Sequence, residues 1–148
     1  MITFAETATD DEIRDAVVKW SELLSQERYA EALDMFLQTS ASFGFEWTPA
    51  RLWDWISNCG CARKDYDSGK YLRVTSVFAQ PHPEEFIRKA ISVDRKNLYG
   101  LEPGQYVGMV HYGDVPLDEV PSDLTASFNI KRLEPGRITL EFVDIHVM

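Results

Sequence analysis

Cysteine is scarce in this chain of 148 residues. The only two, Cys59 and Cys61, are separated by a single glycine. Cysteines this close in sequence form a mutual disulfide only with strain, so reduced thiols are expected, as in a cytoplasmic protein. A structural zinc site needs four ligands, and the histidines are scattered at His82, His111 and His146. The sequence therefore predicts no metal site and no cofactor.

Long apolar runs and an excess of basic residues are also missing. No segment approaches the roughly 18 consecutive apolar residues of a membrane span, and no basic and apolar leader precedes the first helical pattern. Acidic residues outnumber basic ones by 24 to 15, which gives a net charge of −9. Binding to a phosphate backbone needs clustered bases instead. We expect a cytoplasmic protein that binds neither nucleic acid nor membrane.

Recognisable catalytic motifs are absent as well. The chain has no glycine-rich phosphate loop, no zinc-protease histidine pair and no Gly-x-Ser-x-Gly elbow. These absences remove the most easily recognised enzyme classes. They leave the question of catalysis open, with a non-enzyme favoured.

The most informative feature that is present is a repeated tetrapeptide. Leu-Glu-Pro-Gly occurs at 101–104 and again at 133–136, each time between two strand-like runs. Proline fixes φ at the first central position of a turn, and glycine accepts positive φ at the second. Each copy therefore predicts a type II turn that joins two antiparallel strands.

The N-terminal half has helical signals instead. A capping box at 9–12 precedes apolar residues at helical spacing, and Thr48-Pro49 starts a later helix. Strand-like alternation follows toward the C-terminus. We expect one α+β domain over 1–148, with N-terminal helices packed on a curved antiparallel sheet. The expected helices are 9–24, 29–37 and one that starts at 48 and stops at Gly60, with a helical turn at 84–89. The expected strands are 71–78, 90–98, 105–112, 124–133 and 137–147.

Three segments extend this pattern to a resemblance: Trp20 to Leu24, Tyr29 to Leu33, and Phe142 to Val147. Their order resembles the nuclear transport factor two-like superfamily. The resemblance implies a cystatin-like, cone-shaped roll in which the sheet wraps a long N-terminal helix. Some members are enzymes with an Asp–His or Tyr–Asp pair in the cone. Others bind ligands, dimerise or act as acidic immunity proteins.

The last strand offers a candidate catalytic pair. Asp144 and His146 are two residues apart and share a face of the strand, which by extrapolation from the preceding alternation is the core face. A buried carboxylate beside an imidazole suits proton transfer, with His111 or Tyr112 on a neighbouring strand assisting. Alternatively, a β-bulge turns the other face of this strand inward, with Val143, Ile145 and Val147 on the core side.

An acidic loop at 113–123 offers a candidate for partner binding. Its prolines stiffen a mixture of carboxylates and apolar side chains, which lowers the entropy lost on docking, and its charge would steer a basic partner. Trp53 and Trp55 cannot share a helical face, so at least one indole is expected off the core. The predicted partner-binding residues are Asp114, Leu117, Asp118, Glu119, Asp123 and Trp55. Alternatively, the loop is only a solvated connection.

These observations lead to two functional hypotheses. The first is a non-catalytic protein that binds a protein partner, in its most concrete form an acidic immunity-type protein that neutralises a basic bacterial toxin. The second is a small enzyme of the cone fold, isomerase- or hydrolase-like, that uses the Asp–His pair. A homodimer formed through the open sheet face is compatible with both.

Overall fold

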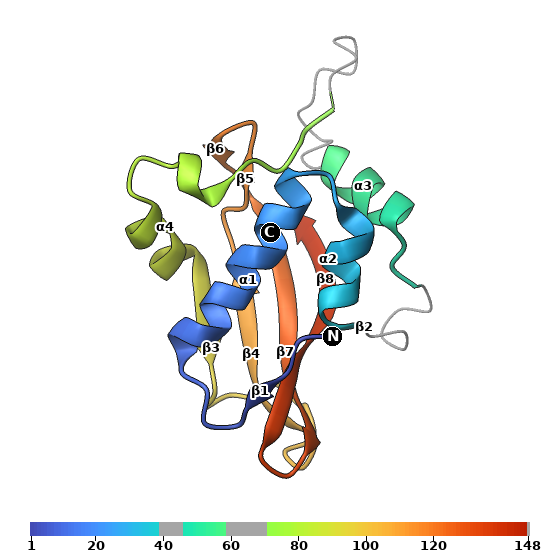
Figure 1. The fold of residues 1–148 in the computed structure, drawn as a ribbon, viewed down its shortest axis with the longest axis vertical. Coiled ribbons are helices and arrows are strands. Elements are labelled where there is room, and N and C mark those ends of the chain that lie inside the picture. Colours follow the sequence, from blue (N-terminus) through green and yellow to red (C-terminus); the bar gives the residue numbers. More distant parts are fainter. Residues whose placement is uncertain (39–45, 59–70, 148) are drawn as a thin grey trace.

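The computed structural model describes residues 1–38, 46–58 and 71–147, and it confirms the predicted α+β class. Helices cover one face of a strongly curled antiparallel sheet that forms a half-barrel (Figure 1). The helices are α1 (Asp10–Ser25), α2 (Tyr29–Met35), α3 (Pro49–Ser57) and α4 (Pro83–Ala90), with a 3₁₀ turn, η3 (Val77–Ala79).

The main sheet has the strand order β1-β8-β7-β4-β3, and β2 pairs with β8 in parallel. A separate two-stranded ribbon, β5–β6, lies at one end of the molecule (Figure 1). The strands are β1 (Phe4–Ala5), β2 (Leu37–Gln38), β3 (Ile91–Asp94), β4 (Tyr106–Tyr112), β5 (Pro116–Leu117), β6 (Val120–Pro121), β7 (Leu124–Glu134) and β8 (Arg137–Val147).

The helix starts are those that the sequence predicts. The Thr9 hydroxyl accepts the backbone N–H of Glu12 at 3.2 Å and caps α1, and Thr48 caps α3 through the N–H of Arg51 at the same distance. Helix α1 crosses the sheet diagonally (Figure 1). Within the described ranges, no helix is both long and apolar enough to span a membrane.

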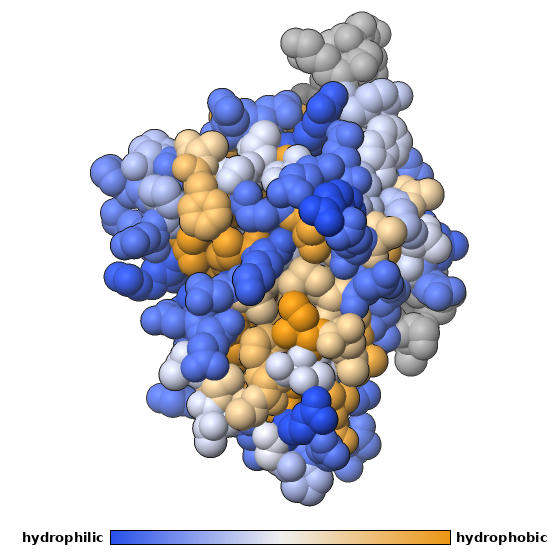
Figure 2. All heavy atoms as spheres, viewed as in Figure 1, coloured by the Kyte–Doolittle hydropathy of each residue, from blue (hydrophilic) through white to orange (hydrophobic). Residues whose placement is uncertain are grey.

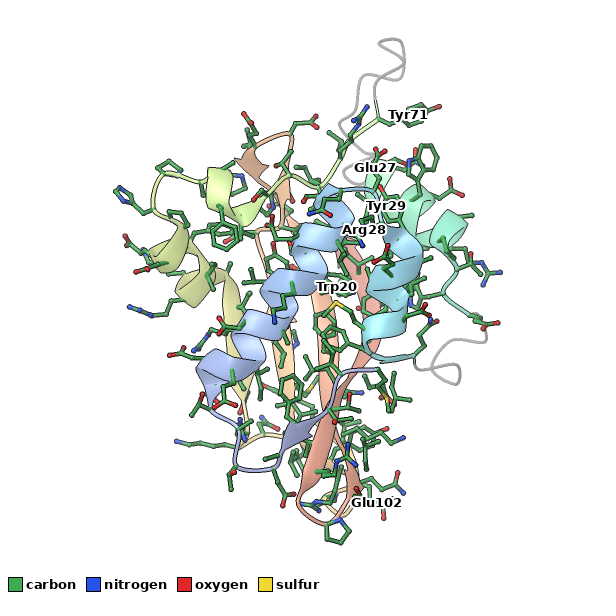
Figure 3. All side chains as sticks on the ribbon, in the orientation of Figure 1. Trp20, Glu27, Arg28, Tyr29, Tyr71 and Glu102 are labelled. Atoms are coloured by element: carbon green, nitrogen blue, oxygen red, sulfur yellow. The ribbon has the colours of Figure 1, made fainter. Side chains whose placement is uncertain are left out.

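We call the face of the sheet that α1 covers the inner face. Four aromatic rings pack there, with ring centroids 5.1 to 5.6 Å apart: Trp20, Phe36, Phe128 and Phe142. All four are at most 4% exposed, and Trp20 lies between α1 and the strands (Figure 3). The space between helix and sheet at this point is occupied by the protein's own side chains.

The two Leu-Glu-Pro-Gly segments adopt different structures. At 133–136 the prediction is confirmed: β7 and β8 form a long hairpin, and Gly136 has φ +84°. At 101–104 the antiparallel pairing of β3 with β4 is confirmed, but the type II turn is wrong. Gly104 lacks positive φ, and the Glu102 carbonyl accepts the N–H groups of both Gln105 and Tyr106, which makes a helix-like turn. Positive φ values occur earlier in that connection, at Tyr99 and Gly100.

The strand predicted at 71–78 is also wrong. Within residues 71–78, only Val74 forms a β-bridge, to Leu117. The chain then turns into η3 because the Glu22 carboxylate of α1 accepts the Ser76 hydroxyl at 2.8 Å and the Val77 N–H at 3.0 Å. A carboxylate on a distant helix therefore overrides the local strand pattern.

Candidate functional site

The acidic loop forms a tight hairpin. Residues Pro116 and Leu117 of β5 pair with Pro121 and Val120 of β6, and the turn consists of Asp118-Glu119 alone. Both turn residues have left-handed φ, +51° and +69°, as a type I′ turn requires. Asn-Gly and Asp-Gly are the usual sequences for such a turn, because Cβ crowds the following carbonyl in left-handed backbone and glycine has no Cβ. Asp118 therefore suits the first position, whereas Glu119 stands where glycine is preferred.

Four hydrogen bonds hold this hairpin against residues 73–75. The Asp118 N–H donates to the Arg73 carbonyl at 3.0 Å, and the Glu119 N–H donates to the Thr75 hydroxyl at 2.7 Å. The Thr75 N–H binds the Pro116 carbonyl, and the Arg73 N–H approaches the Asp118 carboxylate at 3.4 Å. The turn conformation is therefore fixed by contacts to a second segment, which offsets its strain.

Further hydrogen bonds fix the base of the loop. Ser122 donates its hydroxyl to the Val115 carbonyl at 2.6 Å and accepts the Leu124 N–H at 3.0 Å. The Gln80 side-chain amide reaches the Glu119 carbonyl at 3.1 Å. The loop is thus preorganised at its base and at its tip.

The predicted partner-binding residues differ in how far their side chains are exposed to solvent. The four carboxylate residues of the loop are all exposed, and Trp55 is 49% exposed. Leu117, predicted as an apolar anchor, is 5% exposed, so that prediction is wrong: its bridge to Val74 places it in the core. Val120, an apolar residue of the loop that was not predicted as an anchor, is 62% exposed and is the apolar side chain at the surface. The four carboxylates belong to Asp114, Asp118, Glu119 and Asp123.

Left-handed backbone is concentrated in acidic residues. Among the described residues, five other than glycine have positive φ, and four of these are acidic. Glu27 belongs to the same end of the molecule as the hairpin, because its carboxylate forms an ion pair of 3.5 Å with Arg73. Figure 3 shows Glu27 and Tyr71 at this end, with Glu102 at the opposite one. The five residues are Glu27, Tyr99, Asp114, Asp118 and Glu119.

The indoles near α3 have different environments. Trp47 is 4% exposed and meets Trp55 edge to face, with ring centroids 5.8 Å apart. Trp53 is 37% exposed and packs against Tyr71 at 5.2 Å. The expectation that at least one helical indole lies off the core is confirmed, because Leu52 and Ile56 form the buried stripe of α3.

A β-bulge decides where the candidate catalytic pair points. Phe142 pairs with Phe128, whereas Asp144 pairs with Ser127, so Val143 is an extra residue in β8. The alternation reverses beyond it, and Ile145 becomes fully buried. Asp144 and His146 therefore point to the outer face, with side chains 28% and 39% exposed, and not to the inner face that extrapolation predicted. The alternative of a β-bulge is confirmed, and of its inward set Ile145 is buried whereas Val147 is 44% exposed.

The four candidate catalytic residues are divided between the two faces. His146 Nδ1 lies 3.0 Å from an Asp144 carboxylate oxygen, so these two do meet. His111 is on the outer face, two strands away from Asp144, with Ser127 between them. Tyr112 is fully buried on the inner face, where its hydroxyl lies 2.8 Å from that of Ser21. Burial raises the pKa of the Tyr112 phenol.

Within the described residues, no group of three or more histidine, cysteine, aspartate or glutamate side chains could hold a metal ion. Cys59 and Cys61 lie outside those residues. His82, at the N-terminus of α4, is exposed.

The sequence contains one signal for the hairpin beyond its acidic composition. Pro116 and Pro121 flank Leu-Asp-Glu-Val symmetrically, which fits a two-residue turn between two short strands. The contribution of Arg73 and Thr75 left no local signal, because those residues are distant in sequence. Comparisons of the chain with family models, with curated proteins and with solved structures found no match.

Proposed function

We propose that this chain is a non-catalytic binding protein that presents the β5–β6 hairpin to a basic protein partner. The observation on which this depends is the turn Asp118-Glu119. Both carboxylates are exposed, and Glu119 occupies a left-handed backbone position that glycine would fill with less strain. Strain of this kind, maintained by surrounding hydrogen bonds, is typical of functional sites.

The hairpin has the properties that a docking element needs. Because its backbone is fixed before binding, little conformational entropy is lost when a partner docks. Its carboxylates accelerate the approach of a basic surface, and Val120 supplies exposed apolar area beside them. Such a partner fits the immunity-type members of the nuclear transport factor two-like superfamily, which neutralise bacterial toxins. Membership is part of this proposal, and the curled sheet and covering helices are compatible with it.

The enzyme alternative has less geometric support. It requires an acid–base pair inside a hollow cone, whereas aromatic rings fill the inner face and Asp144 and His146 point outward. Tyr112, which would assist, is on the other side of the sheet.

The test is affinity capture from the source cell with a neutralised hairpin. D118N together with E119Q removes two charges and retains the shape of both side chains. The matched control, D34N with E84Q, makes the same chemical changes at exposed residues of α2 and α4. We expect a basic protein to be captured by the wild type and the control and lost by the hairpin variant. Equal capture by all three would remove the hairpin from the proposed function.

A further inference from the structure

The exposed side of α1 is the floor of a surface hollow of about 590 Å³. Four polar residues at helical spacing form the floor, and apolar side chains line both flanks. Phe78, 60% exposed on η3, stands on one flank, and Ile2, Leu23 and Met35 stand on the other. Figure 2 shows this arrangement as a hydrophilic band along α1 with hydrophobic surface on either side. The floor residues are Asp15, Lys19, Glu22 and Gln26.

The order of charges along this floor is self-complementary. In an antiparallel pair of α1 helices related by a two-fold axis midway between residues 20 and 21, Lys19 faces Glu22 of the other copy. The same operation places Asp15 opposite Gln26. Each of these two pairings occurs twice in the dimer, because a two-fold axis repeats every contact of an isologous interface. No ion pair within 4 Å joins Lys19 or Asp15 to another residue of the described part.

The apolar flanks of the hollow are compatible with the same two-fold axis. Because this axis lies in the plane of the interface and perpendicular to α1, each flank of one copy contacts the equivalent flank of the other. Phe78 then meets Phe78, and Ile2 and Met35 meet their equivalents. Apolar surface therefore covers apolar surface on both sides of a polar centre. Phe78 is held in place for such a contact, because Glu22 anchors η3 through Ser76 and Val77.

We infer that this chain forms an antiparallel homodimer through the exposed face of α1. A second copy of the chain covers the hollow, with each flank against its own equivalent. This contact is independent of the β5–β6 hairpin, and it differs from the sheet-face dimer that the sequence suggested.

Sedimentation velocity of the full chain over a wide concentration range, at physiological salt, tests this inference. K19E sets a carboxylate opposite Glu22 twice across the interface, so the dimer dissociation constant should rise by about tenfold or more. K96E is the matched control. It makes the same change of net charge in the exposed connection between β3 and β4, away from α1.

A rescue experiment provides a second readout. A K19E chain mixed with an E22K chain gives opposite charges at both symmetric contacts and removes the like-charge pairs of each homodimer. The mixture should therefore dimerise more tightly than either variant alone. Circular dichroism of E22K checks that loss of the η3 anchor leaves the fold intact. If E22K is misfolded, the comparison between the dimer dissociation constants of K19E and K96E decides the question alone. A wild-type chain that stays monomeric at all concentrations would overturn the inference, as would equal dimerisation of K19E and K96E.

Discussion

The Trp47 indole N–H donates a hydrogen bond of 3.0 Å to the carbonyl of Val143, the extra residue of the bulge in β8. This bond ties the α3 region to the point at which the last strand reverses its alternation. A bulge breaks the hydrogen-bond ladder locally, so its carbonyl needs a partner from elsewhere. Trp47 supplies that partner and packs its ring on Phe142 at 5.2 Å.

Replacing this indole should therefore weaken the protein more than replacing an exposed one. We expect W47F to lower the free energy of unfolding by about 1–3 kcal/mol, because the half-buried Val143 carbonyl loses its donor and the volume of a buried ring is reduced. W55F, at a side chain 49% exposed, is the control and should change it by less than about 1 kcal/mol. Urea unfolding measures both. Equal effects would show that the bulge does not depend on Trp47.

The bulge also illustrates why local sequence patterns do not decide every feature. The cap of α1 and the hairpin turn at 133–136 depend on residues within a few positions of each other, and both were predicted. The bulge depends on an indole 96 residues away, so alternation extrapolated through Val143 placed the Asp–His pair on the wrong face. Long-range contacts decide such features, and one sequence does not show them.

The acidic loop is a second place where a contact distant in sequence decides a feature of the site. Its composition predicted a charged surface and a stiff connection, and the structure confirms that the carboxylates lie at the surface. It did not predict that Leu117 would be buried, because the bridge partner, Val74, lies in a segment that was expected to form a strand of its own. Hydrophobic residues in a loop do not reveal which of them the rest of the chain covers.

The buried Tyr112 phenol, whose hydroxyl contacts that of Ser21, should make the free energy of unfolding fall at alkaline pH. Burial raises the pKa of the Tyr112 phenol, whereas an unfolded tyrosine has a pKa of about 10. The stabilisation is fully present below that value. As pH rises above it, the unfolded chain loses a proton that the folded chain keeps, so the free energy of unfolding falls.

Removing this hydroxyl should reduce that dependence. We expect Y112F to cost about 1 kcal/mol at neutral pH, because the Ser21 hydroxyl loses its partner. Above about pH 10, its unfolding free energy should fall less steeply with pH than that of the wild type. The difference between the two slopes should correspond to the release of at most one proton on unfolding. Urea unfolding at a series of alkaline pH values measures the slope. An unchanged slope would contradict the assignment of Tyr112.

Gly108 occupies a site where no side chain fits. A Cβ atom there would lie 2.5 Å from the Asp94 carbonyl oxygen, a backbone atom of the neighbouring strand, and the register of β4 against β7 shifts between Tyr106 and Gly108. We expect G108A to lower the free energy of unfolding by about 2–3 kcal/mol. G104A is the control, because a Cβ at that position would meet only the Glu102 carboxylate at 4.0 Å. Its effect should stay within about 0.5 kcal/mol, and a similar loss in both variants would contradict the steric argument.

The central claim is that the Asp118-Glu119 turn retains a strained, left-handed glutamate for its charge. The most direct measurement compares stability and binding of the double variant D118N/E119G, which has the sequence that a type I′ turn prefers. We predict that its free energy of unfolding rises by about 1 kcal/mol, because the left-handed strain is relieved. We predict that its affinity for the captured basic partner falls, chiefly through a slower association rate at low salt. A variant that is less stable, or one that binds the partner as well as the wild type does, would contradict the account.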